Sequence, residues 1–585
     1  MKQMSAKFTK AKKKLLFTAL AVVMIVTSLV IPVYADNETA ERYDARMSTL
    51  TALLAEDQKT LAAVEELGKA IAFLSVSDGE SRATTVYASG NRLETALERV
   101  LVRAKYTGIE PKWLKLDVVT SIEEKSYAEF RDYYAEGRRG GSLRKGIAFN
   151  DYFGRAILES ELNSGGYFSY ETGELDLKAI NTYFKANHKK LLDRIPETIW
   201  LFETKGYFTD GEAYPLLNGK NNTKARRDYA TDPEGLTELM KMSSAYLGGL
   251  VGEDGRFIYG YYPIANTEIE GYSIIRHAGT VWNMVLQYDV TRDPTLLKAI
   301  DRAMGYLLTQ LQYKDQKTAF LVSGNELNIG GNGITLLALT SYAEIVGTDR
   351  YNAEIEALAN GVLYMQKADG SFTHAMRADD YTVSRDYIIV FFDGEAMYGM
   401  LKAYGVLGKS KYLNGAKKAA DYFIANNYEE QHSHWIAYGF NELTKYAPLE
   451  KYFAFGLRNV STDDYLTSVR KTKSGSPTRA ETMGAAFELY DRLVESGIEC
   501  DELANFNAAG LIEAFEARID YGLNYFMFPE YAMYFANPTT VLGSFAIRED
   551  LFRIRIDDIQ HFMGGYYLYY KNYDRVQQYK ENNAQ

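Results

Sequence analysis

Cysteine is almost absent from this chain. Its 585 residues include only Cys500, so no disulfide can form within the chain and no zinc site built from cysteines is available. Cys500 stands beside Asp501 and Glu502, whose negative charges disfavour a thiolate, so a catalytic cysteine is not expected. Stability must therefore come from a buried apolar core, for which a chain of this length has ample material over two or more domains.

Several motifs of known chemistry are also missing. The sequence shows no Gly-x-Ser-x-Gly nucleophile turn, no His-Glu-x-x-His zinc motif, and no glycine-rich phosphate loop in the region of residues 87–209 where short β-rich runs occur. Serine hydrolysis on an α/β-hydrolase sheet, zinc proteolysis and nucleotide-phosphate chemistry therefore have no support in the sequence.

A long uncharged run occurs at the N-terminus. Residues 15–33 follow six lysines, and Val33-Tyr34-Ala35 supplies the small residues that signal peptidase requires. Residues 1–35 are thus predicted to be a Sec-type signal peptide cleaved before Asp36, which makes the protein secreted and extracytoplasmic; a retained, membrane-tethering anchor is the alternative. Cleavage removes six positive charges and no negative ones, so the net charge falls from −11 to −17, which argues against nucleic acid as a partner.

The rest of the chain changes character twice. From Met47 to Leu74 apolar residues recur at helical spacing among many charges, which predicts an N-terminal helical segment over residues 36–85. Over residues 86–230 helical stretches alternate with short β-rich runs, which predicts a small α/β domain. From residue 231 to 575 the pattern is helical throughout.

This helical part contains a repeat of form. Segments with a polar start containing glycine or histidine, followed by an apolar helix rich in small residues, occur at 271–289, 330–346, 392–404, 433–446, 477–494 and 555–570. Between them lie helices with lysine and glutamate on one face, at 238–250, 295–311, 351–366, 411–426 and 502–525. An inner layer of weakly charged helices with charged outer partners predicts a mainly α fold, an (α/α)6 barrel.

Two short segments carry a resemblance to known helical toroids. Residues 365–372 (Met-Gln-Lys-Ala-Asp-Gly-Ser-Phe) resemble the turn repeated in terpene-cyclase-like toroids, and residues 393–396 (Asp-Gly-Glu-Ala) open an inner helix in a layout similar to the six-hairpin glycosidase and sugar 2-epimerase group. The resemblance covers residues 232–574 and lies in the toroid architecture, since no catalytic motif of any single family matches. The aspartate-rich motif of terpene cyclases is absent, so cyclase activity is set aside.

The starts of the inner helices define the candidate site. Inner helices of such a barrel begin at the same end, so their free backbone N–H groups and positive dipole ends converge on one mouth. The catalytic candidates there are Asp393, Glu395, Glu481, Asp557, His277 and His561. The substrate-binding candidates are Arg276, Asn332, His434, Trp435, Arg479 and Gln560, with Tyr259, Tyr261 and Tyr262 as exposed aromatic platforms in the loop before the first inner helix.

Each candidate also has a structural interpretation. Asp393 and Glu395 suit the first turn of a helix because of its dipole, and arginines at the mouth can pair with such acids as structural ion pairs. His277 can be a hydrogen-bonded core histidine, Trp435 can be core, and Asp557 with His561 can form a local pair on one helix face.

Glycan chemistry is the function that this set of residues favours. Glycosidic hydrolysis needs two carboxyls, which Asp393 or Glu395 facing Glu481 or Asp557 would supply. Elimination or epimerisation needs a base beside an arginine, as in His277 with Arg276 or His561 with Arg479. Because acids outnumber bases, the sequence favours a cofactor-free, metal-free glycoside hydrolase acting on an envelope or extracellular polysaccharide.

Two other classes stay open. The first is a non-catalytic polysaccharide-binding or assembly protein that uses the toroid mouth as a groove. The second is a metal-dependent enzyme with His277, His434, His561 and an aspartate as ligands, although no compact ligand spacing supports it.

Overall fold

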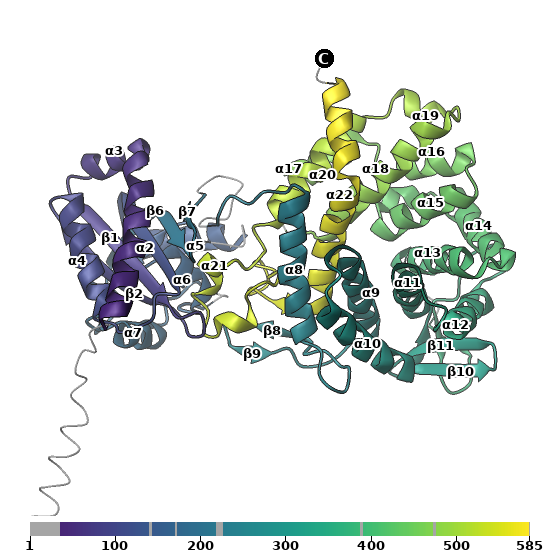
Figure 1. Cartoon of the computed structure of the whole chain (residues 1–585), viewed down its shortest axis with the longest axis horizontal. Coiled ribbons are helices and arrows are strands. Elements are labelled where there is room, and N and C mark those ends of the chain that lie inside the picture. The colour runs from purple at the N-terminus through teal and green to yellow at the C-terminus, as the bar shows by residue number, and fades with distance from the viewer. Residues whose placement is uncertain are drawn as a thin grey trace, which may run out of the picture. The chain divides into compact units, whose positions relative to one another are not determined.

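The computed structural model describes residues 36–139, 143–169, 172–217, 226–385, 390–471 and 475–583 (Figure 1). Its contacts divide the chain into two compact units that interleave along the sequence. The first unit takes the chain up to Lys125, Ile147–Ala156 and Leu177–Pro215; the second takes Ser126–Gly146, Ile157–Asp176 and the chain from Leu216 onward. The predicted signal peptide lies outside the described residues, and the predicted domain limits at residues 85, 230 and 575 stay predictions.

The first unit is built on a β-sheet. The strand order is β2-β1-β3-β6-β4-β5, with β7 paired to β6, and β1 pairs antiparallel with both β2 and β3. The strands are β1 (Ala70–Ser77), β2 (Thr84–Gly90), β3 (Trp113–Ser126), β4 (Gly146–Ala148), β5 (Ala156–Ile157), β6 (Thr198–Thr209) and β7 (Ala213–Pro215). The helices of this unit are α2 (Asn37–Glu56), α3 (Gln58–Glu66), α4 (Leu93–Lys105) and α7 (Leu177–Ala186).

The N-terminal helical segment is shorter than the sequence predicted. The helical spacing continues to Leu74, but helix ends at Glu66 and residues 70–77 form strand β1. All side chains of β1 are buried, so both faces of this strand are covered. Such a strand lacks the alternation of polar and apolar residues that would distinguish it from a helix in the sequence. The helix before it is confirmed: α2 packs Tyr43, Leu50 and Leu54 into the core shared with the sheet and α4.

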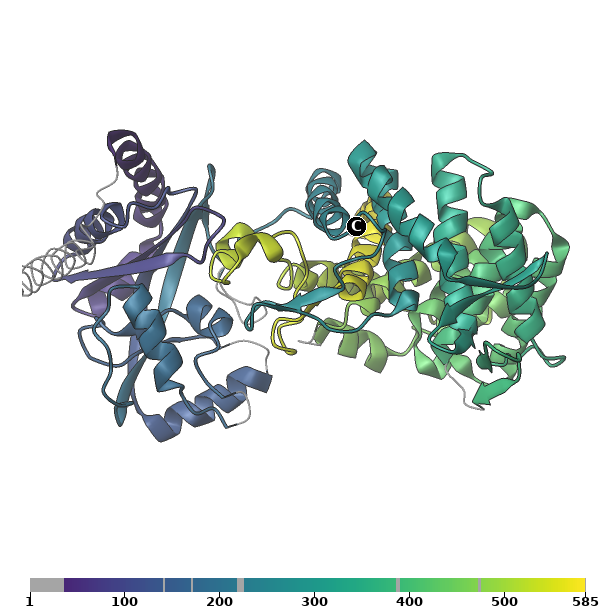
Figure 2. The ribbon, with the colours of Figure 1, turned by 90° about the horizontal axis from the view of Figure 1, so that it is seen from below.

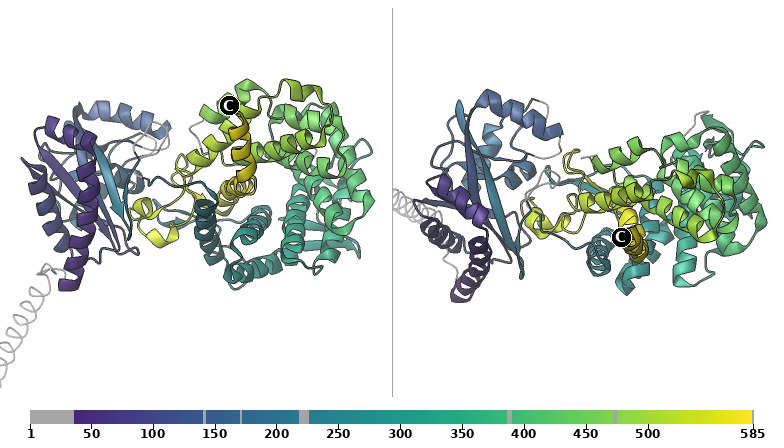
Figure 3. Two further views of the ribbon diagram at one scale, coloured as in Figure 1. Left: turned by 45° about the horizontal axis from the view of Figure 1, so that its top comes forward. Right: turned by 90° about the horizontal axis from the view of Figure 1, so that it is seen from above.

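The second unit is a ring of paired helices. The inner helices are α9 (Ile274–Thr291), α11 (Ile329–Val346), α13 (Val390–Leu407), α15 (His434–Tyr446), α18 (Thr478–Ser496) and α22 (Ile556–Asn583). Each packs against the next in this order, and α22 packs against α9, which closes the ring (Figure 3). In Figures 1 and 2 the yellow helix α22 lies beside the teal helices that open the ring.

An outer layer covers the ring. Its helices are α8 (Pro233–Gly249), α10 (Pro294–Thr309), α12 (Asn352–Met365), α14 (Ser410–Ala425), α16 (Glu450–Arg458) and α20 (Ala508–Gly522), each packed against one or two inner helices. The pattern had predicted all of them except α16, which Phe453, Phe455 and Leu457 hold against the core. The remaining helices of this unit are α5 (Tyr127–Arg139), α6 (Glu159–Ser164), η1 (Tyr428–Gln431), α17 (Asp463–Lys471), α19 (Asp501–Ala504), α21 (Pro529–Ala532) and η2 (Pro538–Thr540).

Short strands precede several inner helices. One sheet has the order β10-β11-β12-β13-β14 and another the order β15-β8-β9. The strands are β8 (Gly260–Tyr262), β9 (Thr267–Glu268), β10 (Leu311–Asp315), β11 (Thr318–Ser323), β12 (Glu326–Asn328), β13 (Ala375–Arg377), β14 (Val383–Arg385) and β15 (Ile554–Arg555). Because β12 runs directly into α11 and β15 into α22, these sheets stand at the end of the ring where the inner helices begin.

The predicted fold class is confirmed: the chain is mainly α-helical, with an (α/α)6 barrel preceded by a small sheet-containing unit and an N-terminal helix. Among the described residues we find no helix that is both long enough and apolar enough to span a membrane.

Candidate active site at the toroid mouth

The first two turns of neighbouring inner helices touch one another. An ideal Cβ on Gly330 of α11 would lie 2.2 Å from Glu395 Oε2 of α13, and one on Gly394 of α13 would lie 2.6 Å from the Trp435 Cβ of α15. Likewise, Gly564 of α22 gives room to the carboxylate of Glu481 of α18. The inner helices therefore begin at the same end, and their glycines allow carboxyl and indole side chains to lie close to the neighbouring backbone.

His561 and Glu481 form the central pair of the mouth. His561 Nδ1 lies 2.8 Å from Glu481 Oε2, and the Tyr438 hydroxyl donates to the other carboxylate oxygen over 3.2 Å. Glu481 is fully buried, whereas the His561 side chain is 20% exposed, so the imidazole is the part of the pair that solvent reaches. Burial opposes charge on His561, but the neighbouring Glu481 outweighs this and raises the pKa of the imidazole.

His434 faces His561. Their ring centroids lie 5.2 Å apart at an interplanar angle of 87°, and Trp435 borders both rings. Burial lowers the pKa of His434 well below its usual value, and the charge on His561 lowers it further. No described residue hydrogen bonds to His434 Nε2, although the atom is buried. The surroundings therefore shift the pKa values of the two histidines in opposite directions, down for His434 and up for His561.

Glu395 is a buried carboxyl of the same cluster. Its Oε2 has no hydrogen-bond partner among the described residues. Burial raises the pKa of Glu395 to about 8, and only the charge on His561 acts in the opposite direction. A carboxyl in this setting carries a proton at neutral pH and is a proton donor.

Asp393, two residues earlier on α13, is fully engaged. His374 Nε2 lies 2.6 Å from Asp393 Oδ1, and the Tyr428 hydroxyl donates to Oδ2 over 3.1 Å. The side chains of His374 and Asp393 are both buried. Neither His374 nor Tyr428 was predicted from the sequence, and the nearest signal was the position of His374 just after the turn at residues 365–372.

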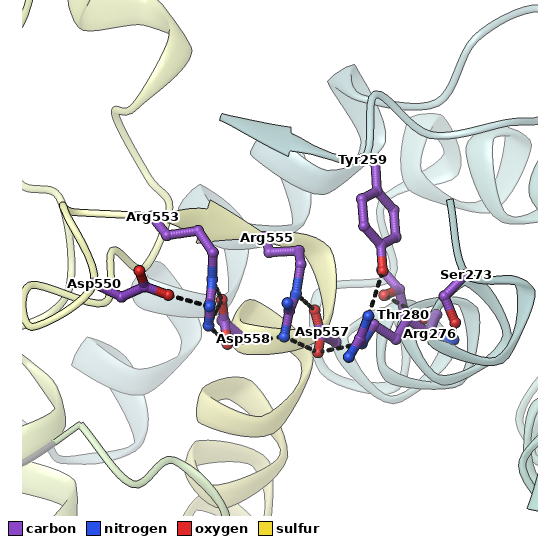
Figure 4. A network of polar contacts seen from close by, with 9 residues as sticks. All are labelled: Tyr259, Ser273, Arg276, Thr280, Asp550, Arg553, Arg555, Asp557 and Asp558. Atoms are coloured by element: carbon purple, nitrogen blue, oxygen red, sulfur yellow. Dashed lines mark hydrogen bonds and ion pairs between the residues drawn. The ribbon is translucent and has the colours of Figure 1, made fainter. Parts of the chain in front are cut away.

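Asp557 belongs to a network of alternating charges (Figure 4). Its carboxylate pairs with Arg276 of α9 over 3.0 Å and with Arg555 of β15. Next to it, Arg553 bridges Asp558 and Asp550. Burial and the neighbouring Asp557 raise the pKa of Asp558 to about 6. Because Asp557 and Arg276 belong to the last and first inner helices, the network closes the ring.

We expect Asp557→Asn to lower the free energy of unfolding by about 1–3 kcal/mol, because the mostly buried guanidinium of Arg555 then loses the carboxylate that pairs with it. Asp550→Asn is the matched control, since the Asp550 carboxylate is 46% exposed and Arg553 is its one ion-pair partner among the described residues. Its cost is expected to stay below about 1 kcal/mol. Urea unfolding followed by circular dichroism measures both. Equal losses in the two variants would show that Asp557 does not close the ring.

Several predicted residues lie away from the central pair. His277 is fully buried and bonds through its ring nitrogens to the Tyr272 hydroxyl and to the Ala303 carbonyl of α10, and burial lowers its pKa to about 4. Asn332 is also fully buried and bonds to the backbone of Ala319, Leu321 and Leu358. Both side chains face the outer layer, so neither is placed to meet a substrate at the mouth.

The remaining candidates border the mouth or support it. Tyr259 was expected to be exposed but is buried, and its hydroxyl accepts a hydrogen bond from Arg276 Nη1. Tyr261 and Tyr262 are half-buried in β8. Gln560 is buried against Gly279 of α9, and Arg479 donates to the Ser468 carbonyl. The expected triple aromatic platform is therefore not formed.

Aromatic rings separate the mouth from the other end of the ring. Trp282 contacts Trp435 at 5.7 Å and Tyr438 at 5.8 Å between ring centroids, and Tyr398 stacks on Tyr438 at 5.4 Å. Trp282, Tyr398 and Tyr438 also line a cavity of about 210 Å³ that reaches residues near the C-terminal ends of inner helices, such as Ile345 of α11 and Lys445 of α15. These rings thus fill the middle of the toroid, between the mouth and this cavity.

The mouth also contains a group that bears on metal binding. Ligand atoms of His434, Glu481 and His561 all lie within 4.8 Å of one another. His561 Nδ1 and Glu481 Oε2 are 2.8 Å apart, however, which is a hydrogen-bond length and shorter than the separation of about 3.3 Å between two ligands of one tetrahedral zinc ion. The geometry therefore favours a hydrogen-bonded pair, and His277 of the predicted ligand set is not part of this group.

Comparisons with known proteins concern the architecture. No family model matches the chain, and no curated protein matches its sequence. Similar solved structures include a D-mannose isomerase (13% identity, 59% of this chain and 100% of that chain, TM-score 0.43) and an unsaturated glucuronyl hydrolase specific for heparin (12%, 59% and 98%, TM-score 0.41). Another is the cellobiose 2-epimerase of Bacillus thermoamylovorans B4167 (13%, 50% and 87%, TM-score 0.39). The (α/α)6 ring itself is shown by the packing of the chain's own helices.

Proposed function

We propose that this chain is a sugar-active enzyme that performs general acid–base chemistry at the toroid mouth with His434, His561 and Glu395. The observation that carries the proposal is the perpendicular contact of two histidines whose pKa values are shifted in opposite directions. Titratable groups whose surroundings push their pKa values apart are the usual acid and base of an active site.

The surroundings of each group suggest its role. Neutral His434 has a buried, unpartnered Nε2 that is available to accept a proton. His561 carries a proton that it can return, and Glu481 holds its ring in place through Nδ1. Glu395 is protonated near neutral pH and is suited to donate to a sugar oxygen on which negative charge develops.

The reaction that fits these roles is proton transfer at the carbon next to the carbonyl of an open-chain sugar, as in isomerisation or epimerisation. This chemistry needs one base, one returning acid and a donor to the oxygen, and it needs no second carboxylate. The predicted second carboxylates are otherwise engaged: Asp393 with His374, and Asp557 with two arginines.

Hydrolysis of a glycosidic bond is the second candidate. The observation in its favour is Glu395, because cleavage needs a protonated carboxyl beside the leaving oxygen. Its partner carboxylate would have to be Glu481, released from His561. For either reaction we propose that the protein acts outside the cytoplasm on an envelope or extracellular glycan, which the predicted signal peptide supports.

The two reactions differ in what they incorporate from solvent. We expect the purified chain, incubated in D₂O with D-mannose, cellobiose or α-1,6-mannotriose, to exchange a carbon-bound hydrogen next to the carbonyl of at least one sugar, seen by NMR. EDTA in the same assay is expected to leave the rate unchanged. His434→Asn serves as the inactive control.

Each other result is informative. New reducing ends without deuterium at carbon would favour hydrolysis over the proposed proton transfer. Saturable binding of all three sugars with neither exchange nor cleavage would support the polysaccharide-binding alternative. Loss of the rate in EDTA, restored by zinc or manganese, would contradict the metal-free mechanism.

A further inference from the structure

The first unit contains a large groove of its own. Its volume is about 910 Å³, at the upper end of the range of about 300–1,000 Å³ that is typical of small-molecule sites. Its walls come from the start of β2, the C-terminal end of α4, residues 152–155 before β5 and residues 187–190 after α7. All of these segments belong to the first unit, so the groove is independent of the toroid mouth.

The charge of this groove is opposite to that of the chain. Its lining includes Arg103, Arg155, Lys189 and Lys190, together with His188, and no aspartate or glutamate. The whole chain carries a net charge of −11, so a groove lined by basic residues alone differs from the average composition of the chain. Arg103, Arg155 and Lys190 form no ion pair with any described carboxylate. A groove of this kind attracts an anion.

Contacts within the first unit hold Arg103 and Lys189 in place. The Arg103 guanidinium lies over the Tyr87 ring, 5.2 Å from its centroid, and donates to the Tyr87 carbonyl. The buried Arg155 Nε has no hydrogen-bond partner among the described residues. Lys189 Nζ donates to the Ala156 carbonyl over 2.7 Å, which fixes its stem beside the groove. The two guanidinium groups offer paired N–H donors that match the two oxygens of a carboxylate.

Tyrosine rings border the same groove. Tyr106 is 50% exposed and Tyr152 is 58% exposed, which places both among the most exposed large apolar side chains of the described chain. Gly154 allows the loop that carries Tyr152 to lie close to Tyr87, since an ideal Cβ on Gly154 would lie 2.8 Å from both the Tyr87 hydroxyl and the Tyr152 ring. Exposed flat rings beside cations suit a ligand that has both apolar faces and acidic groups.

We propose that this groove binds an acidic glycan, a chain of sugars that carry carboxylate groups. The carboxylates would pair with Arg103, Arg155 and Lys190, while a sugar face stacks on Tyr152. The basic lining of the groove indicates an anionic ligand. The choice of a glycan over another polyanion rests on the proposed function of the toroid.

The test is calorimetric titration of the full mature chain with tetragalacturonate, and with maltotetraose as the neutral control, in 50 mM NaCl at pH 7. We expect binding of the uronide only, weakened about tenfold or more in 300 mM NaCl because screening acts on exposed charges. The double variant Arg103→Gln/Lys190→Gln is expected to bind at least about tenfold more weakly, since it removes two charge-assisted contacts. Tyr152→Ala is expected to lose about fivefold.

Matched controls separate this site from the toroid. Lys185→Gln changes the net charge by one unit on exposed α7 outside the groove, and we expect it to bind as the wild type does. His561→Asn is expected to lower kcat by about 10³-fold and to leave uronide binding intact, so failure of the catalytic proposal would leave anion binding by this groove standing. Uronide binding that survives in the double variant, or that is lost in His561→Asn, would overturn the assignment. Tighter binding of an oligothymidylate than of the uronide at the same salt would also overturn it.

Discussion

Replacing His434 or His561 by asparagine is expected to lower kcat for sugar conversion by about 10³-fold, the size of effect associated with a positioned proton-transfer group. Asparagine at position 561 keeps an amide N–H for Glu481, so the carboxylate stays satisfied while the proton carrier is gone. Both changes leave the contact between Trp435 and Trp282 in place, so KM is expected to move by less than about threefold. Steady-state kinetics on the sugar identified by deuterium exchange gives both constants.

His432→Asn is the matched control for this experiment. His432 lies two residues before His434, but its ring stacks on Tyr465 with the centroids 3.9 Å apart and Nδ1 lies 2.6 Å from the Asn459 carbonyl. Its backbone has a φ of 49°, a left-handed conformation that asparagine adopts readily. We expect full activity from this variant. A loss below tenfold in both His434→Asn and His561→Asn would remove the histidines from the mechanism.

The ring and the grouping at its mouth were predictable from the sequence because both follow from local rules. Weakly charged helices with small residues must pack inside, and their shared direction brings their first turns together. Glu395, His434, Trp435, Glu481 and His561 meet as that rule requires. The rule predicts the position of a residue along the axis of its helix, because the polar segments in the sequence mark where each inner helix begins.

The rule does not fix which way a side chain points around its helix. One turn takes 3.6 residues, so a shift of one residue rotates a side chain by about 100°. His277 and Asn332 stand at the predicted height but face α10, β11 and α12, where backbone groups satisfy them. Their orientation depends on the neighbours that the outer layer supplies, and no local pattern contains that information.

Two further features depend on contacts between distant segments. In the network around Asp557, the carboxylate pairs both with Arg555, two residues away, and with Arg276 of the first inner helix. Arg276 and Asp557 are separated by nearly the whole sequence of the toroid. The basic groove of the first unit gathers Arg103, Arg155 and Lys190 from three separate segments. In the sequence these arginines and lysines stand among ordinary surface charges, so only the fold brings them together.

Glu395→Gln is expected to lower kcat by about 10²-fold and to change its pH dependence, because the amide can donate a hydrogen bond but no proton. In the wild type the rate needs neutral His434, protonated His561 and protonated Glu395. With the pKa of Glu395 raised to about 8, loss of its proton is expected to lower the rate about tenfold per unit above 8. In the variant this step should disappear and only the step that belongs to His561 should remain, which a pH profile of kcat measures directly.

The same substitution is expected to stabilise the fold at alkaline pH. The folded pKa of Glu395 lies above its usual 4.5, so the wild type binds more protons folded than unfolded and loses stability as the pH rises from 4.5 towards 8. One pKa unit corresponds to about 1.4 kcal/mol, so even half of that shift makes the free energy of unfolding of Glu395→Gln about 2 kcal/mol larger than that of the wild type at pH 8.5. This difference vanishes near pH 4. Urea unfolding at both pH values measures it. A variant that is inactive yet gains no stability at pH 8.5 would mean that Glu395 is ionised at rest, and its carboxylate would then act as a base instead of a proton donor.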